Sequence, residues 1–168
     1  MDIRVGQGYD VHAFADNREL WLGGVKIEHE KGLAGHSDAD VLLHALCDAL
    51  LGAANMRDIG YHFPDTGQQY AGIDSKILLQ QTYELLLNKG YRLGNADCII
   101  CAQAPKLSPH IDKMRECIAG VLKVEPDRIS IKATTTERLG FVGRKERIAA
   151  YATLLITKDK LTIPKKIN

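Results

Sequence analysis

The sequence predicts a single α/β domain in which helices cover one face of a mixed β-sheet and the other face packs in a homotrimer core. Its 168 residues, 45% hydrophobic and 26% charged, suit one domain with a buried core. Strand-like segments are interspersed with helical ones, which is typical of this fold class. The strand-like segment 147–157 is apolar almost throughout, so we expect the uncovered face to meet other copies of the chain.

The first half of the chain begins with a strand. Residues 1–14 alternate like a strand, and we expect a bend at Gly6–Gly8. Residues 19–30 predict a hairpin around a Gly-Gly pair. A strong helix is expected from about residue 36 to Ala54, with Ser37 as its N-cap.

A long connection then leads to the second half of the chain. Residues 58–74 are rich in Gly, Pro and Asp, and we expect a functional loop there. The following helix is capped by Asp74 or Ser75 and closed by Gly90. The remaining expected elements are a strand over 91–104, a helix from Ser108 with Pro109 in its first turn, strands over 128–137 and 147–157, and a basic tail over 158–168.

Charge and composition exclude several classes of protein. The 22 basic and 21 acidic residues leave a net charge of +1, which argues against a nucleic-acid or membrane-surface binder. No apolar run is long enough to span a membrane, and no signal peptide is expected. Cys98 and Cys101 fall on opposite faces of a strand, which favours buried thiols over a redox or zinc pair. With Cys47 and Cys117 they suggest a cytoplasmic protein.

The segment "GYDVHAF" raises the possibility of a metal site. Asp10 and His12 are two residues apart, so an extended backbone points both side chains the same way. Val11 and Phe14 can then face the core. Two residues of this kind on one side favour a metal, although a structural role for both remains open.

The helix supplies a third candidate ligand. His44 lies among apolar residues, and Asp40 and Asp48 flank it by one turn on the same stripe, where a carboxylate could hold its second N–H. Asp10, His12 and His44 would leave one position open, which is the pattern of a catalytic zinc. Spacing alone leaves open a solvated carboxylate with a core histidine.

Other polar segments could bind an anion. His36 and Ser37 precede the helix and suggest an anion seat, although simple capping explains Ser37 equally well. Lys106 lies in the strand-end loop 102–109, and three threonines end another strand in the segment 132–144. Taken alone, this second segment could be a polar turn.

These motifs together resemble one family, the 2-C-methyl-D-erythritol 2,4-cyclodiphosphate synthases. The matching segments are "GYDVHAF", "GLAGHSDADVLLHALCDALLGA", "DIGYHFPDT", "DSKILL", "AQAPKLSPHI" and "IKATTTERLGFVGR". They run from about residue 3 to 157, which suggests a synthase domain over 1–157 and a tail over 158–168. The segment 145–147 and Tyr151 depart from many relatives near the three-fold axis, where the family has a cavity.

The resemblance implies a homotrimer with active sites at its subunit interfaces. It implies a phosphorus–oxygen lyase of non-mevalonate isoprenoid biosynthesis, in which the 2-phosphate of 4-diphosphocytidyl-2-C-methyl-D-erythritol 2-phosphate attacks the β-phosphorus and CMP leaves. No protein nucleophile is needed. A zinc phosphohydrolase and a non-catalytic assembly protein with an ancillary metal remain the alternatives.

The resemblance also assigns roles to residues. It places Zn²⁺ on Asp10, His12 and His44, a second ion (Mg²⁺ or Mn²⁺) on Glu137, and transition-state stabilisation on His36 and Thr135. The residues it places against the substrate are Asp10, Val11, His12, His36, Ser37, Asp58, Ile59, Gly60, Phe63, Pro64, Asp65, Thr66, Gly67, Ala102, Gln103, Ala104, Pro105, Lys106, Leu107, Ser108, Thr134, Thr135, Thr136, Glu137, Phe141 and Arg144.

Overall fold

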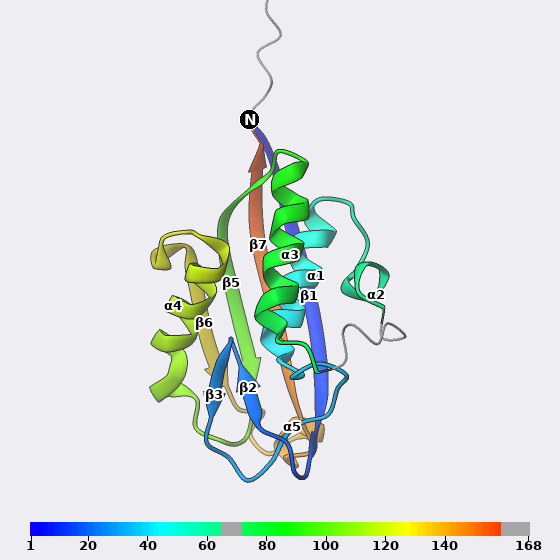
Figure 1. Ribbon diagram of the computed structural model, residues 1–168. Coiled ribbons are helices and arrows are strands. Elements are labelled where there is room, and N and C mark those ends of the chain that lie inside the picture. The colour runs from blue at the N-terminus through cyan, green and yellow to red at the C-terminus, as the bar shows by residue number, and fades with distance from the viewer. Residues whose placement is uncertain (65–71, 159–168) are drawn as a thin grey trace, which may run out of the picture.

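A five-stranded sheet in the order β4-β1-β7-β5-β6 forms one layer of the computed structural model, which describes residues 1–64 and 72–158 (Figure 1). Its strands are β1 (Asp2–Ala15), β4 (Gly32–Leu33), β5 (Arg92–Cys101), β6 (Ile129–Thr134) and β7 (Arg147–Lys158). β5 and β6 are parallel and the other pairs are antiparallel, which confirms the predicted mixed sheet. The predicted hairpin, β2 (Leu20–Leu22) and β3 (Val25–Ile27), stands apart as a two-stranded sheet.

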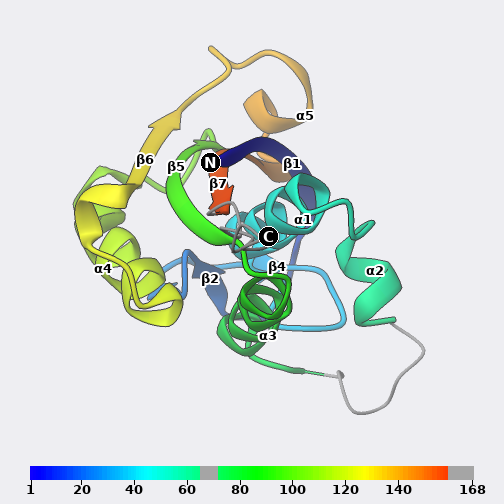
Figure 2. The ribbon, with the colours of Figure 1, turned by 90° about the horizontal axis from the view of Figure 1, so that it is seen from above.

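Three helices form the second layer, namely α1 (Val41–Ala53), α3 (Ser75–Asn88) and α4 (Ile111–Leu122). The short α2 (Ile59–His62) lies beside α1, and the short α5 (Gly140–Gly143) lies on the other side of the sheet (Figure 2). Figure 2 shows α1 between the sheet and α3, and α4 beside β5 and β6. This position explains why α1 is apolar nearly all round, since a helix with neighbours on two sides has little surface to expose.

The two glycines of β1 bring α1 close to the sheet. A Cβ on Gly6 would lie 1.9 Å from the carbonyl oxygen of Ala49, and a Cβ on Gly8 would lie 1.9 Å from that of Ala45. β1 pairs with β7 without a break through both positions. The predicted bend was therefore wrong, because these glycines serve close packing of a helix rather than a turn.

The start of α1 also differs from the prediction. The helix begins at Val41 with Asp40 as its N-cap, not at Ser37. The fully buried Asp40 carboxylate accepts hydrogen bonds from the N–H groups of Leu42 and Leu43, at 3.2 and 3.1 Å, and from two N–H groups of the hairpin. Burial raises the pKa of Asp40, and these N–H groups oppose that rise. Asp40 thus occupies the free N–H groups at the start of α1, where an anion-binding site was expected.

The later elements agree better with the sequence. Asp74 caps α3 as predicted. Pro109 lies in a 3₁₀ turn, Ser108–His110, that leads into α4. The long connection after residue 58 was expected to be a loop, but it begins with the short α2. Residues 65–71 and 159–168 lie outside the described part, and within that part no helix is long and apolar enough to cross a membrane.

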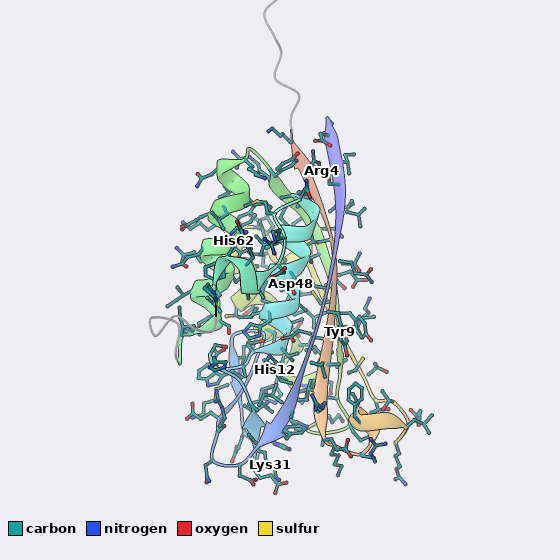
Figure 3. All side chains as sticks on the ribbon, turned by 90° about the vertical axis from the view of Figure 1, so that its right-hand side faces the viewer. Arg4, Tyr9, His12, Lys31, Asp48 and His62 are labelled. Carbon is teal, nitrogen blue, oxygen red and sulfur yellow. The ribbon has the colours of Figure 1, made fainter. Side chains whose placement is uncertain are left out.

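Within residues 1–64 and 72–158, the sheet face opposite α1, α3 and α4 is uncovered along most of its length (Figure 3). Figure 3 shows the sheet edge-on, with the labelled His12 and Asp48 on the helix side. Large apolar side chains of β1 and β7 lie 36–66% exposed on the open side, namely Ile3, Val5, Tyr9, Tyr151 and Leu155. Val11 shares the strand parity of Tyr9, so its predicted place in the core was wrong, whereas Phe14 packs against the core.

Candidate active site

Three side chains able to bind a metal ion converge where β1 faces α1. Asp10 Oδ2 lies 2.8 Å from His12 Nε2 and 3.0 Å from His44 Nδ1, and the two nitrogens are 3.1 Å apart. Ligands around a tetrahedral zinc ion with bonds of about 2.0–2.1 Å stand about 3.3 Å apart. The atoms would thus need to separate by only a few tenths of an ångström, about 0.2–0.5 Å. Within residues 1–64 and 72–158 no other group of three His, Cys, Asp or Glu side chains lies so close together.

Both imidazoles are held through the nitrogen that points away from this cluster. His12 Nδ1 donates to the carbonyl oxygen of Ala34 at 2.7 Å. Because a carbonyl can only accept, His12 Nε2 keeps its lone pair for the cluster. His44 Nε2 lies 3.1 Å from Ser37 Oγ and 3.0 Å from Ser75 Oγ. Histidines that bind metals are usually oriented in this way.

The flanking carboxylates of α1 do not hold His44, and that part of the prediction was wrong. Asp40 is occupied by the backbone N–H groups at the helix start. Asp48 Oδ1 accepts a hydrogen bond from the N–H of Ile59 at 2.7 Å, which connects α1 to α2. Burial raises the pKa of Asp48, and the hydrogen bond from the N–H of Ile59 partly offsets that rise. Nearby backbone donors thus take up both carboxylates.

The charges of the cluster favour a cation. Burial disfavours the ionised carboxyl of Asp10, but hydrogen bonds with His12 and His44 hold its pKa well below its usual range. Burial also opposes protonation of His12, yet the hydrogen bond and the charge of Asp10 raise its pKa. With both imidazoles neutral, two nitrogen lone pairs face each other beside a carboxylate. A cation between them removes this repulsion, and one carboxylate with two imidazoles suits Zn²⁺.

A cavity of 230 Å³ adjoins the cluster. It is lined by Asp10, His12, Gly35, His36, Ser37, His44, Asp48, Ile59, Gly60, Phe63, Ile73 and Leu78. The structure therefore brings His36, Ser37 and the start of α2 close to the three proposed ligands. Asp58 caps α2 by accepting from the N–H of Tyr61 at 2.9 Å. Pro64 ends the described segment, and Asp65, Thr66 and Gly67 lie outside the described residues.

A second cavity, of 360 Å³, lies at the carboxyl ends of β5 and β6. Its lining residues are Ala102, Gln103, Ala104, Pro105, Lys106, Leu107, Ser108, Ala133, Thr134 and Thr135. This set contains the whole segment 102–108, which is among the residues that the resemblance placed against the substrate. It has no residue in common with the lining of the first cavity. In a single chain the two halves of the expected site are therefore separate.

Glu137 lies beyond the second cavity and outside the three-residue cluster. It is exposed, and its Oε1 accepts a hydrogen bond from Thr135 Oγ1 at 3.1 Å. The Thr136 hydroxyl donates to the carbonyl oxygen of Leu139 at 2.7 Å and closes the turn. The N–H of Arg138, the residue after Glu137, donates to Gln103 Oε1 at 3.1 Å. This hydrogen bond connects the turn to the second cavity.

Phe141 and Arg144, which the resemblance also placed against the substrate, lie on and beside α5. Phe141 is 38% exposed. Arg144 donates to both carboxylate oxygens of Glu146, at 2.7 and 3.1 Å. Glu146 belongs to the segment that departs from many relatives, and this pairing neutralises the arginine locally.

The cysteines agree in part with the prediction of buried thiols. All four are free, but Cys101 is only half-buried. Cys98 is buried and Cys101 lies on the other strand face, and burial raises the pKa of Cys98 to about 12. Neither thiol therefore resembles a reactive or metal-binding cysteine at neutral pH.

The sequence reasoning missed two residues around His44. Ser75 was considered only as a helix cap, and Asp38 was not considered as part of the site. Ser75 contacts His44 from 31 residues further along the chain, and Asp38 is linked to His44 through Ser75. Both residues belong to segments that match the resemblance, which is the sequence signal that could have pointed to them.

Comparison with known proteins places the chain among a well-defined group. A profile described as the YgbB family matches residues 3–157. The 2-C-methyl-D-erythritol 2,4-cyclodiphosphate synthase of Bacteroides thetaiotaomicron is 66% identical over 159 residues, covering 95% of this chain and 100% of the relative. The solved bifunctional IspDF of Campylobacter jejuni has a TM-score of 0.91 at 44% identity, covering 95% of this chain and 43% of that longer one. IspF of Plasmodium falciparum, solved as a CDP complex, has a TM-score of 0.82 at 36% identity, covering 94% of this chain and 97% of that one.

Proposed function

Because the chain belongs to the YgbB family, we infer that it catalyses the reaction for which its relatives are named, the synthesis of 2-C-methyl-D-erythritol 2,4-cyclodiphosphate in the non-mevalonate isoprenoid pathway. The substrate is 4-diphosphocytidyl-2-C-methyl-D-erythritol 2-phosphate. An oxygen of its 2-phosphate bonds to the β-phosphorus, the bond from that phosphorus to the bridging oxygen breaks, and CMP leaves with the bridging oxygen. The carrying observation is the convergence of Asp10, His12 and His44 beside a cavity.

The reaction needs no nucleophile from the protein. Because the P–O bond to CMP is broken by ring closure, without water or a second acceptor, the enzyme would be a phosphorus–oxygen lyase. Two anionic groups of one molecule must instead be held together in line. The three-ligand cluster would hold Zn²⁺, which supplies Lewis-acid polarisation of a phosphoryl oxygen when bound. The exposed carboxylate of Glu137 would hold a second ion, Mg²⁺ or Mn²⁺, since hard cations prefer oxygen ligands.

The chain's own polar groups orient the substrate. His36 and Ser37 line the first cavity, where an imidazole N–H and a hydroxyl can donate to phosphate oxygens. Thr135 lines the second cavity, and its hydroxyl would donate in the same way after turning away from Glu137 Oε1. We assign His36 and Thr135 to stabilising the charge that develops at phosphorus, because hydrogen-bond donors aimed at that charge lower the energy of the transition state.

The second cavity is the proposed cytidine pocket. The backbone of the 102–108 loop can read the edge of the base, and Lys106 can contact phosphate. The CDP complex of the Plasmodium falciparum relative supports a cytidine nucleotide as ligand. Asp58 and Gly60 would bind the ribose hydroxyls. The other proposed substrate contacts are Val11, Ile59, Phe63, Pro64, Asp65, Thr66, Gly67, Thr134, Thr136, Phe141 and Arg144.

The complete site requires more than one chain. We propose a homotrimer in which the open sheet faces pack together, because apolar side chains gathered on one face mark an interface. The metal half of the site, which is the first cavity with Asp10, His12 and His44, would then meet the nucleotide half, which is the second cavity, of the neighbouring subunit. The four free thiols support a cytoplasmic location.

Product analysis tests the reaction. The purified chain is incubated with the substrate and Zn²⁺ plus Mg²⁺, and the phosphorus NMR spectrum of the products is recorded. The expected result is CMP and a cyclic diphosphate, with both lost after removal of divalent metal by a chelator. A linear 2,4-bisphosphate, which carries two separate phosphate monoesters, would instead identify a hydrolase that uses water. Cyclic product from fully metal-free protein would refute the metal-assisted mechanism.

Variants separate catalysis from an ancillary metal. His12→Ala and His44→Ala each remove one proposed ligand and are expected to abolish CMP release. His110→Ala is the matched control, because His110 lies in the 3₁₀ turn before α4 and outside both cavities. Unchanged CMP release by both ligand variants would show that no chemistry depends on the cluster.

A further inference from the structure

Ser75 is a fully buried polar residue in contact with one of the proposed metal ligands. It is the first residue of α3, it is 0% exposed, and its Oγ lies 3.0 Å from His44 Nε2. Its hydroxyl also makes a short hydrogen bond to Asp38 Oδ1, and its backbone N–H donates to Asp38 Oδ2 at 3.0 Å. Asp38 is therefore bound by both polar groups of Ser75.

The direction of these hydrogen bonds follows from the carboxylate. An ionised carboxylate can only accept, so the single hydroxyl hydrogen of Ser75 is directed at Asp38. The contact of Ser75 with Ser37 Oγ, at 3.4 Å, is much longer and does not compete. The Ser75 oxygen can then only accept from His44, so His44 Nε2 carries the hydrogen. This leaves His44 Nδ1 with its lone pair toward Asp10 and His12.

Ser37 supports the same arrangement without replacing it. Its Oγ accepts from the N–H of Ala39 at 3.0 Å and lies 3.1 Å from His44 Nε2. Within the described residues its hydroxyl has no hydrogen bond to a carboxylate. It also lines the first cavity, where substrate phosphate is proposed to bind. Ser75 is fully buried outside the cavity lining, and its hydroxyl donates to the Asp38 carboxylate. Its oxygen is thus the stronger hydrogen-bond acceptor for His44.

We propose that Asp38 and Ser75 are positioning residues for the metal, acting in series on His44. Asp38 polarises the Ser75 hydroxyl, and Ser75 fixes the tautomer of His44 and raises the basicity of its Nδ1. The proposal rests on the proposed function, because it presumes a metal at Asp10, His12 and His44. Outer hydrogen-bond partners of this kind typically change metal affinity 10- to 100-fold when removed.

Zinc affinity of the full chain, stripped of metal, tests the proposal through competition with a chromophoric chelator. Ser75→Ala is expected to weaken zinc binding about 10- to 100-fold. Asp38→Asn is expected to weaken it as well, because an amide can donate to Ser75 Oγ and turn its hydroxyl hydrogen away. Adding Asp38→Asn to Ser75→Ala should cause little further loss, since Asp38 acts through Ser75. Thr82→Val, which removes another fully buried hydroxyl of α3, should leave the affinity unchanged.

The outcomes distinguish failure of this inference from failure of the proposed function. Circular dichroism first establishes that each metal-free variant is folded. If the unaltered chain itself does not bind zinc, the proposed metal site is wrong. If it binds zinc and Ser75→Ala binds equally well, only the positioning role is overturned. Losses that multiply in the double variant would overturn the serial arrangement.

Discussion

Replacing Gly8 by alanine is expected to push α1 away from β1 and so to open the metal cluster. A Cβ at this position would lie 1.9 Å from the carbonyl oxygen of Ala45 and 2.8 Å from the nitrogen of Ala49. Both atoms belong to the backbone of a helix and cannot rotate aside. Carbon–oxygen contacts require about 3.3 Å, so α1 must retreat by about 1.4 Å, the difference from the present 1.9 Å.

The same retreat would break the geometry of the proposed ligands. His44 is the neighbour of Ala45, so its Nδ1 would move from 3.0 Å to about 4 Å from Asp10 Oδ2. Metal sites tolerate deviations of about 0.2 Å in bond length. We therefore expect zinc affinity to fall by at least about 100-fold. Overpacking should also cost about 1–3 kcal/mol of stability, which lowers the melting temperature of a chain of this size by about 2–12 °C.

Chelator competition and thermal unfolding of the metal-free chain measure the two effects. Gly52→Ala is the matched control, because Gly52 lies on the same helix and a Cβ there would meet nothing within 4 Å. The free energy of unfolding of this control should rise by about 0.5–1 kcal/mol, and its zinc affinity should equal that of the unaltered chain. If Gly8→Ala bound zinc within twofold of the unaltered chain, the glycine contact would not set the ligand spacing.

Three further predictions concern the cluster, the open sheet face and the loop that carries His36. Zinc binding requires a neutral His12 imidazole, whose pKa in the metal-free chain is raised above its ordinary value of 6.5. Zinc affinity should therefore fall about tenfold per pH unit below that pKa. A zinc affinity that does not change with pH in chelator competition would contradict this. Val5→Asp should yield a smaller species by light scattering and lower activity, whereas Lys113→Asp, on exposed α4, should not; an unchanged mass would contradict the proposed interface. Arg18 donates to the carbonyl oxygens of Gly35 and Ser37, the two neighbours of His36, at 2.8 and 2.5 Å. Arg18→Met should therefore lower kcat about 10- to 100-fold and leave zinc affinity unchanged. An unaltered kcat would exclude a role of Arg18 in orienting His36.

Short-range geometry accounts for only part of the proposed ligand set, because His44 lies more than 30 residues from Asp10 and His12 and was placed beside them by the resemblance. Asp10 and His12 had to share a strand face, and an imidazole among apolar helix residues needed a partner. The residues that orient His44 were not predictable in this way. Ser75 reaches it from another helix, a contact that only the packing of α3 on α1 creates.

The start of α1 shows the same limit. Ser37 and Asp40 are both good caps, so local preference does not choose between them. The structure places Asp40 at the cap, where it also binds two N–H groups of the β2–β3 hairpin at 3.0 and 2.7 Å. The glycines of β1 were misjudged for a similar reason, since a close helix and a bend ask for the same residue.

The absence of any shared lining residue between the two cavities has a genetic consequence. If the metal half and the nucleotide half of each site come from different subunits, a chain with His44→Ala still carries an intact nucleotide half, and a chain with Lys106→Ala still carries an intact metal half. Either chain alone would be defective, but trimers assembled from both would contain some sites built from two intact halves. Two damaged alleles could then complement each other within one cell, and the activity restored would report how readily subunits mix.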